Sequence, residues 1–251
     1  MADITIIKLG GSLLEDSGRR AHALREIVSR WTAGAKLVIV HGGGKHIDAS
    51  LARLGIAKRT HAGLRITDDA TLPVVVGTLA GVVNKMLVAE LNALGAEAAG
   101  IAGSDAGTLI AEPHPPIDGI ELGHVGRITT SNATLLQAML VSGFLPVVAS
   151  LAQGPNASLL NVNADTAAAA IAIALGAKTL HFVTDVAGLL DADGNVVPHL
   201  AEADAEKFLA STIVSGGMRP KLEAALSALR AGVATIGIGE LTEGGTNLVA
   251  A

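Results

Sequence analysis

Residues 4–12 read ITIIKLGGS, an apolar run that ends in two glycines, and residues 36–45 read KLVIVHGGGK, which has the same pattern. Short apolar runs bounded by glycine are typical of β-strands that are covered on both faces. Glycine at the end of such a strand lets the backbone approach a ligand and turn its N–H groups toward an anion. Two glycine-rich strand ends in one sheet therefore indicate an anion site, although either one alone is equally typical of a tight strand-to-helix turn.

The rest of the chain alternates between short apolar runs and helix-length segments. This alternation predicts an α/β fold, a three-layer αβα sandwich with a mainly parallel central sheet, in which ligands bind beyond the carboxyl ends of the strands. A small antiparallel hairpin is expected within 120–128, and the loop-like stretch 150–158 suggests a boundary between two lobes. The expected strands are 4–9, 36–40, 97–101, 145–150, 178–184 and 234–238, and the expected helices are about 18–32, 67–94, 131–142, 164–175, 203–211 and 218–230.

Composition argues against several classes of protein. The 251 residues carry a formal net charge of −5 and 2% aromatic side chains, whereas an extended nucleic-acid surface needs a basic face and stacking aromatics. The most apolar later segment, 167–177, is shorter than the roughly 18 to 20 residues that span a bilayer, and no signal peptide is recognised. The chain has no cysteine, which suits a reducing compartment. We therefore expect a cytoplasmic protein with no nucleic-acid or membrane partner.

Residues 161–165, NVNAD, place two asparagines and an aspartate at the start of the helix expected at 164–175. Helix capping accounts for Asn163 and Asp165, since a cap and a first-turn acid both stabilise a helix start, but it leaves Asn161 unexplained. Lys221 lies in the first turn of the helix expected at 218–230, where its charge opposes the helix dipole unless an anion is nearby. A solvated surface lysine is the alternative.

Arg65 stands between a glycine loop and the long helix expected at 67–94, in the sequence GLRIT. A guanidinium suits two-pronged recognition of a carboxylate, although most arginines are simply solvent-facing. No set of His, Asp and Glu has convincing metal-ligand spacing, so we assign no metal to protein ligands. Residues 43–46 do not match a P-loop, and residues 237–242 do not match a dinucleotide fingerprint.

Taken in order, KLGGS, VIVHGGGKHID, GLRIT, the NK pair at 84–85, ELGHVG, GFLPVV, NVNAD, TDVAGLL and GGMRPK resemble the acetylglutamate kinases of the amino-acid-kinase family over nearly the whole chain. The resemblance implies ATP-dependent phosphorylation of the side-chain carboxylate of N-acetyl-L-glutamate in arginine biosynthesis. It implies an N-terminal lobe, 1–150, for acetylglutamate binding and dimerisation, and a C-terminal lobe, 151–251, for ATP. Mg²⁺ would be held mainly by the ATP phosphates. No general base is required, because the attacking carboxylate is already ionised at neutral pH.

The resemblance also assigns roles to residues. It implies that Lys8 and Lys221 neutralise the transferred phosphoryl group and that Asp165 orients them. Arg65 and Asn161 would hold the α-carboxylate and amide of acetylglutamate, and Asn163 would support the site. The remaining assignments are Gly43 and Gly44 on the acetylglutamate side, with the Gly44 N–H facing the phosphoryl group, and Gly10, Gly11, Thr184, Asp185, Gly188, Gly217 and Met218 on the nucleotide side, with the Gly11 N–H facing the same group.

Two alternatives stay open. One is a kinase for N-acetyl-aminoadipate or another amino-acid carboxylate; N-acetyl-aminoadipate is one methylene longer, and a methylene is worth only about 1–3 kcal/mol in a pocket. A non-catalytic amino-acid sensor of the same fold would bind the ligand but lose the lysines. Residues 245–248, Gly-Thr-Asn-Leu, depart from the family pattern, which more often has a basic and a β-branched residue there.

Assembly is the last expectation from the sequence. Apolar residues cover more than one side of the helix expected at 67–94, whereas an ordinary surface helix needs only one apolar face. A homodimer that buries the second face is therefore expected, with burial against neighbouring loops as the alternative. No helical extension is seen before the first strand. Members of the family that arginine inhibits as ring hexamers usually carry one, so the resemblance implies a dimer that arginine does not inhibit.

Overall fold

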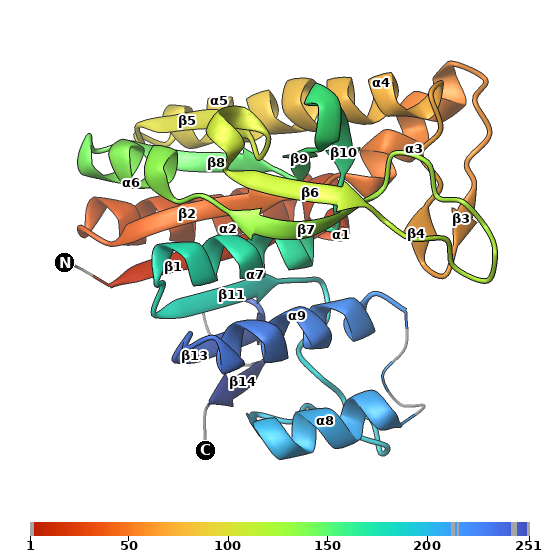
Figure 1. Ribbon diagram of the computed structural model, residues 1–251. Coiled ribbons are helices and arrows are strands. Elements are labelled where there is room, and N and C mark those ends of the chain that lie inside the picture. The colour runs from red at the N-terminus through yellow and green to blue at the C-terminus, as the bar shows by residue number, and fades with distance from the viewer. Residues whose placement is uncertain (1–2, 212–213, 215, 242–244, 250–251) are drawn as a thin grey trace.

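The computed structural model describes residues 3–211, 214, 216–241 and 245–249. Within these residues the central sheet has eight strands (Figure 1), in the order β12 (His199–Ala201), β14 (Thr246–Val249), β13 (Thr235–Gly239), β11 (Thr179–Val183), β1 (Ile4–Leu9), β2 (Lys36–His41), β8 (Leu145–Ala149) and β5 (Ala98–Ala102). All neighbours from β13 to β5 are parallel. Strand β14 is antiparallel to β13 and parallel to β12, so the sheet is parallel except at one edge.

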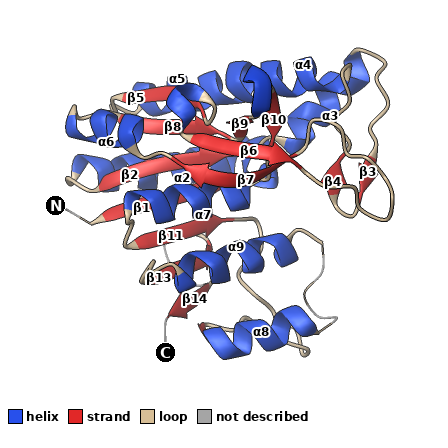
Figure 2. Ribbon diagram, viewed as in Figure 1, coloured by secondary structure: helices blue, strands red, loops and turns tan. Residues whose placement is uncertain are grey.

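Helices cover both faces of this sheet, which confirms the αβα sandwich (Figure 2). One face carries α6 (Thr134–Val141), α7 (Ala164–Leu175) and α9 (Met218–Arg230), with α8 (Glu202–Ala210) packed beside α9. The opposite face carries α1 (Gly11–Glu15), α2 (Ser17–Thr32) and α5 (Asn84–Ala93). A third, smaller core joins α3 (Gly44–Arg53) and α4 (Thr71–Val76) to the end of β8.

A second sheet packs beside α7, above it in Figure 1, and has the order β10 (Leu159–Asn161), β9 (Leu151–Gln153), β6 (Leu109–Pro113) and β7 (Gly126–Ser131). A separate hairpin, β3 (Thr60–His61) and β4 (Leu64–Arg65), projects beside it, and two 3₁₀ turns span Asp105–Gly107 and Pro155–Ala157. The hairpin expected within 120–128 is wrong. Strand β7 pairs with β6, Gly123 pairs with Thr67, and Ile120 pairs with Ile117, so residues 120–128 bond to other segments rather than to each other.

The strands expected from the sequence all form, each within one residue of the expected ends. The expected helices also form, but the long one starts at Thr71 rather than Thr67. Asp68 accepts a hydrogen bond from the Thr71 N–H at 2.9 Å and so takes part in starting the helix, while Thr67 is buried in a bridge to Gly123. The sheet draws strands from both sides of residue 150, and the lobe boundary placed there stays a prediction.

The helix that begins at Thr71 continues without a break to Ala93, through a π-helical stretch, Gly77–Val83 (η1), that joins α4 to α5. A π-helical stretch of this kind is uncommon and is frequently found at functional sites. Here its Leu79 and Val83 side chains reach the Gly43 loop, where a Cβ on Gly43 would lie 3.0 Å from Leu79. By length and composition alone this helix could cross a membrane, with a mean hydropathy of 1.8, but core helices of soluble proteins pass the same test and its residues line two cores here.

A buried polar network fixes the carboxyl end of β2. Asn84 is fully buried, and its side-chain amide donates to His41 Nε2 at 3.1 Å and to the Val147 carbonyl at 2.9 Å. The other ring nitrogen of His41 lies 2.9 Å from the Gly42 carbonyl, to which it donates in the tautomer that leaves Nε2 as acceptor. Gly100 provides the space, because a Cβ there would lie 1.9 Å from Asn84 Oδ1. The residue before the Gly42–Gly44 loop is thereby locked in one orientation.

His41 should make the unfolding free energy fall with acid. Burial lowers its pKa to about 4. The unfolded chain binds a proton as the pH falls through about 6.5, whereas the folded chain does so only near the lowered value, so stability is lost between the two. The wild-type free energy of unfolding should therefore fall by about 2–3 kcal/mol between pH 7 and 4.5 because of His41, and the replacement His41→Gln should abolish this fall. Urea unfolding at both pH values measures this, and His199→Gln, at an exposed position on β12, is the matched control. Equal pH dependence in wild type and His41→Gln would contradict it.

Candidate active site

Two lysines and one aspartate form a buried cluster at the carboxyl ends of the central strands. Lys8 Nζ lies 2.8 Å from Asp165 Oδ1, and Lys221 Nζ lies 3.1 Å from the same oxygen. All three side chains are almost completely buried, with 7–8% of their surface exposed. The three residues come from positions 8, 165 and 221, so the fold unites three segments that are far apart in the sequence. The cluster carries one net positive charge, which a bound anion would neutralise.

Each member of the cluster is held by its own element. Lys8 is the fifth residue of β1 and pairs in register with Phe182 on β11. Asp165 lies in the first turn of α7, where Asn163 accepts hydrogen bonds from the Asp165 and Thr166 N–H groups at 2.7 and 3.2 Å. Lys221 lies in the first turn of α9, with its ammonium 5.5 Å from the centre of the Phe182 ring. Asn163 is therefore the N-terminal cap of α7. Lys221 is buried, so the alternative that it is a solvated surface lysine is wrong.

Electrostatics decide the charge states in the cluster. Burial alone would raise the pKa of Asp165, but the charges of Lys8 and Lys221 outweigh it and hold the pKa below its ordinary value. Burial, followed by the charge of Lys8, lowers the pKa of Lys221 against the opposing effect of Asp165. The carboxylate thus stays ionised and gives two ammonium groups a common anchor. Without it they would repel each other in a low-dielectric site.

The two glycine-rich strand ends lie next to this cluster in the fold. Gly10 bonds through its N–H to the Val183 carbonyl at 3.0 Å, and a Cβ on Gly10 would lie 2.9 Å from that oxygen, so only glycine lets β1 leave the sheet so close to β11. Gly11 and Gly44 are the first residues of α1 and α3, where backbone N–H groups have no partner within the helix. A Cβ on either would meet no atom within 4 Å, so both face open space.

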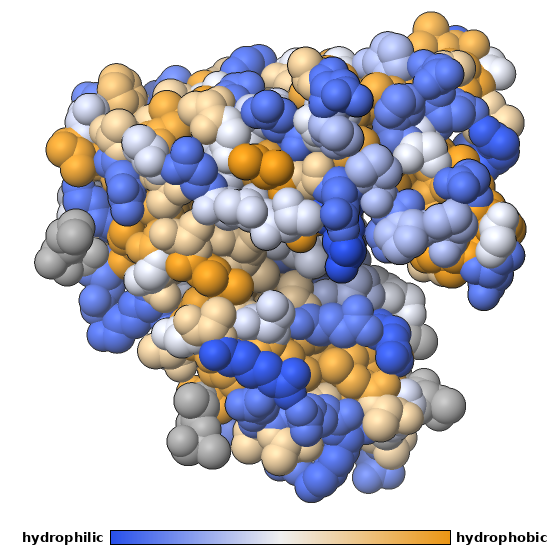
Figure 3. Space-filling view, viewed as in Figure 1, coloured by the Kyte–Doolittle hydropathy of each residue, from blue (hydrophilic) through white to orange (hydrophobic). Residues whose placement is uncertain are grey.

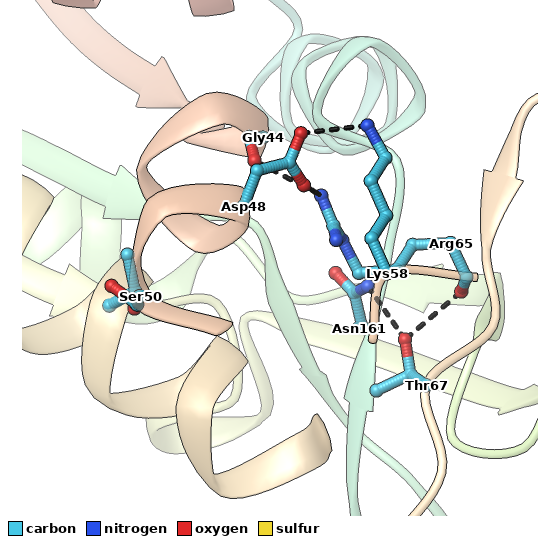
Figure 4. A network of polar contacts seen from close by, with 8 residues as sticks. Gly44, Asp48, Ser50, Lys58, Arg65, Thr67 and Asn161 are labelled. Atoms are coloured by element: carbon cyan, nitrogen blue, oxygen red, sulfur yellow. Dashed lines mark hydrogen bonds and ion pairs between the residues drawn. The ribbon is translucent and has the colours of Figure 1, made fainter. Parts of the chain in front are cut away.

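Arg65 and Asn161, expected to bind the same ligand, lie close together (Figure 4). Asn161 donates to Thr67 Oγ1 at 3.1 Å, and Thr67 in turn donates to the Arg65 carbonyl at 3.0 Å. The Arg65 guanidinium contacts the Gly44 carbonyl at 3.0 Å and the Asp48 carboxylate through Nη2. Its other terminal nitrogen, Nη1, is buried without a hydrogen-bond partner among the described residues. A buried unpaired N–H group is costly, so this atom indicates a place for an absent acceptor.

The residues expected on the nucleotide side gather at two places. Thr184 and Asp185 follow β11, and a hydrogen bond from Ser12 on α1 is the main cause that lowers the pKa of Asp185. Gly188 is packed so closely against Thr246 of β14 that a Cβ would lie 2.9 Å from the Thr246 hydroxyl oxygen. Gly217 and Met218 begin α9, one turn before Lys221. The departure noted at 245–248 thus falls on β14, which still pairs with β13, while residues 242–244 lie outside the described residues.

A cleft of about 1210 Å³ opens beside the cluster. It is lined by Gly63 and Leu64 on the β3–β4 side, by Asn163 and Asp165 on α7, and by Gly216 and Gly217 at the start of α9. Figure 3 shows the surface hollowed between the part formed by α8 and α9 and the projecting β3–β4 arm. The cleft therefore connects the lysine and aspartate cluster with the loop that carries Arg65.

Comparison with known proteins identifies the family. The model of the amino acid kinase family matches residues 3–239, and the chain belongs to this family. Within the family, the chain is 43% identical over 228 residues to the acetylglutamate kinase of Rubrobacter xylanophilus, covering 91% of this chain and 85% of that protein. It is also 43% identical to the acetylglutamate kinase of Geobacillus thermodenitrificans, covering 91% and 86%. The resemblance drawn from the sequence motifs is thereby confirmed.

Solved structures agree with the family. The crystal structure of smu.665 from Streptococcus mutans has a TM-score of 0.87 and 30% sequence identity, and the match covers 99% of each chain. An N-acetylglutamate synthase from Neisseria gonorrhoeae has a TM-score of 0.86 at 23% identity, over 98% of this chain and 59% of that one. Carbamate kinase from Giardia has a TM-score of 0.73 at 15% identity. The last two likenesses show a shared fold.

Several residues of the site were missed by sequence reasoning. Ser12, Asp48, Thr67 and Phe182 each contact a predicted site residue. Two of them had a local signal: Ser12 directly follows the Gly10-Gly11 pair, and Thr67 lies two residues after Arg65, whose carbonyl it contacts. Asp48 and Phe182 meet their partners through contacts between elements, which no spacing along the chain encodes.

Replacement Asp165→Asn should destabilise the fold. It leaves two buried ammonium groups facing each other without a counter-charge, and breaking a buried pair in this way costs about 3–5 kcal/mol. Urea unfolding at pH 7 measures the loss. Lys8→Met is the control, because it keeps the Lys221–Asp165 pair and should cost clearly less. An Asp165→Asn variant as stable as wild type would show that the cluster is not electrostatically strained in this way.

Proposed function

We propose that this protein transfers the γ-phosphoryl group of ATP to the side-chain carboxylate of N-acetyl-L-glutamate, in arginine biosynthesis. One bond from the γ-phosphorus to the ADP oxygen breaks and one to a carboxylate oxygen forms, giving ADP and N-acetyl-L-glutamyl 5-phosphate. The observation that carries the proposal is the pair of buried lysines on one aspartate oxygen, beside a cleft that is lined by Asp165 and by Gly63 and Leu64, the two residues before Arg65. Acetylglutamate kinases at about 43% identity over most of the chain support the choice of substrate.

The chemistry needs charge stabilisation rather than proton transfer. Both ATP and the acceptor carboxylate are anionic, so their repulsion has to be offset where the phosphoryl group moves. Lys8 and Lys221 supply fixed positive charge there, and Asp165 holds both ammonium groups in place without neutralising them fully. The N–H groups at Gly11 and Gly44 would add aligned donors for the phosphoryl oxygens. Mg²⁺ would be held mainly by the nucleotide phosphates and would add positive charge there.

The two ends of the acceptor would be bound by different elements. Arg65 offers its unpaired Nη1 to the α-carboxylate, and Asn161 lies beside it on β10 for the acetamido group. Asn163 supports the site as the cap of α7, which places Asp165. Thr184, Asp185, Gly188, Gly217 and Met218 would contact the nucleotide from the strand β11 side and the start of α9. A cytoplasmic location remains a prediction from the sequence.

A trapping assay tests the proposed reaction. The protein is incubated with ATP, Mg²⁺ and N-acetylglutamate or N-acetyl-aminoadipate, and hydroxylamine converts any acyl phosphate to a hydroxamate. We expect hydroxamate with N-acetylglutamate at a higher kcat/KM than with its longer homologue. A preference for N-acetyl-aminoadipate would reassign the substrate, and no hydroxamate from folded protein with either acceptor would favour a non-catalytic sensor.

Replacement of either lysine should slow catalysis strongly. Lys8→Ala and Lys221→Ala should each lower kcat by at least about 10²-fold, the scale for loss of one preorganised charge-stabilising group. Asp165→Asn should lower kcat less than either, if it acts by orienting the lysines. The double lysine variant should be clearly non-additive, because the two charges act on one group. Near-wild-type kcat in either single variant would remove that lysine from the site.

We also propose that two copies associate through the helix from Thr71 to Ala93. Its inward residues Leu79, Val83, Leu87 and Leu91 are buried in the cores, yet Val82 remains 59% exposed on the outer side. One exposed apolar residue is normal on a monomer, so the proposal rests on the apolar length of this helix and on Leu72, Val76 and Met86, which are only partly buried. Burial of this side by the chain's own loops is the alternative.

Light scattering at low micromolar concentration should give about twice the chain mass of 25.1 kDa. Val82→Glu should raise the dissociation constant of the dimer by about 10-fold or more, because a charge would be buried in the interface. Val249→Glu is the matched control, since Val249 is 42% exposed on β14, near the other end of the sheet order from β5. A species of chain mass alone would count against the dimer.

A further inference from the structure

The guanidinium of Arg65 is only partly engaged by the protein. Its Nη2 contacts two acceptors, the Gly44 carbonyl and the Asp48 carboxylate, which matches the two hydrogens that this nitrogen carries. Its Nη1 is buried and has no partner among the described residues. The side chain as a whole is 11% exposed, so this free nitrogen has little access to bulk water. The protein has thus fixed one nitrogen and left the other for a ligand.

Asp48 is bonded to two cations, one through each oxygen of its carboxylate. One of its carboxylate oxygens, Oδ1, contacts Arg65, and the other, Oδ2, accepts from Lys58 Nζ at 2.7 Å (Figure 4). Asp48 follows Gly44 by one turn of α3, so Arg65 lies across the first turns of this helix and contacts both. Lys58 precedes the β3–β4 hairpin, and Asp48 therefore ties both ends of the segment 58–65 to α3.

The position of Arg65 would be unfavourable without Asp48. A cation near a helix N-terminus faces the positive end of the helix dipole. Burial alone would raise the pKa of Asp48, but the hydrogen bonds from Lys58 and Arg65 outweigh it, so the pKa is lowered and the carboxylate is charged at neutral pH. Lys58 bonds to Oδ2 of Asp48 and Arg65 to Oδ1, so the positive charge that a ligand at Nη1 would meet is that of Arg65.

We propose that Asp48 is a positioning residue for the acceptor substrate: it holds Nη2 of Arg65 so that the free Nη1 is presented to the α-carboxylate of the acceptor. The inference rests on the function proposed above and extends it to a residue that never touches the substrate. Because both Nη2 hydrogens are used, Arg65 would bind the α-carboxylate through Nη1, rather than through a fork formed by both terminal nitrogens.

A rival interpretation makes Asp48 a latch that competes with the substrate for Arg65. The two interpretations predict opposite changes in acceptor binding when Asp48 is replaced. Loss of a positioning residue weakens binding of the acceptor, whereas loss of a competitor strengthens it. The unpaired Nη1 favours positioning, since a latch would be expected to occupy the nitrogen that the ligand needs.

The test compares two acceptors in the Asp48→Asn variant. N-acetylglutamate has an α-carboxylate, and N-acetyl-γ-aminobutyrate is the same molecule without it. We expect Asp48→Asn to lower the wild-type preference for N-acetylglutamate, measured as the ratio of the two kcat/KM values, by about 10-fold or more. The change should appear in KM for N-acetylglutamate, with KM for ATP little altered. Asp48 is 30% exposed on a helix, so the variant should fold, and Asp48→Ser is a second variant for the same comparison.

Two control variants separate positioning from hairpin anchoring. Lys58→Met removes the other partner of Asp48 but leaves the contact with Arg65. Asp118→Asn removes the side-chain contact with His61 on the same hairpin, and His61 pairs with Leu64 rather than with Arg65. Both should keep the wild-type preference between the two acceptors. A loss of preference equal to that of Asp48→Asn in either control would overturn the proposal.

The remaining outcomes are equally decisive. Equal loss of kcat/KM on both acceptors in Asp48→Asn would assign Asp48 to structure, and a lower KM for N-acetylglutamate would assign it to a latch. Either result leaves the proposed function intact, because the wild type would still form hydroxamate. A folded wild type that forms no hydroxamate with either acceptor would instead overturn the function and this inference together.

Discussion

Two ammonium groups and one carboxylate are buried together where β1, α7 and α9 meet, and this arrangement constrains the rest of the chain. Lys8 and Lys221 both reach one oxygen of Asp165, so the three elements that carry them need fixed positions relative to one another. The parallel pairing of β1 with β11 places Lys8. The Asn163 cap fixes the first turn of α7 and so places Asp165. The start of α9 places Lys221, whose charge opposes the helix dipole and is stabilised there by Asp165.

The glycine loops depend on a second buried network. His41 ends β2 and is held neutral by burial, with Asn84 bonded to one ring nitrogen and the Gly42 carbonyl beside the other. Asn84 follows the π-helical segment, whose Val83 also packs against Gly43. A neutral histidine adds no charge beneath the loop, so the positive charge of the site stays on Lys8 and Lys221. The long helix thereby links the outer surface proposed for dimerisation to the loop that would face the phosphoryl group.

Sequence alone predicts six of the eight strands of the central sheet, because each of those six is a local signal, an apolar run with a turn at its end. The two strands at one edge, β12 and β14, are only three and four residues long and were not predicted. The second sheet was missed because β9 and β10 are only three residues long, and because β6 and β7 are largely exposed and so lack the continuous apolar run of a central strand. The long helix was placed four residues early, because Thr67 and Asp68 are equally good caps by composition and only the tertiary bridge of Thr67 to Gly123 decides between them. For the same reason Lys221 had no local sign of burial and Asp48 no local link to Arg65.

The proposed acceptor is a dicarboxylate, and the protein holds one fixed positive site for each of its ends. Arg65 is immobilised by Asp48 and the Gly44 carbonyl, while Lys8 and Lys221 are immobilised by Asp165. When both ends of a pocket are anchored by ion pairs, neither can move to suit a longer substrate without breaking a contact. A substrate with one more methylene then has to bend its chain or give up one charged contact, and the second costs more than the methylene gains. Selectivity for chain length would therefore come from the rigidity of the two charged anchors rather than from the shape of the wall between them.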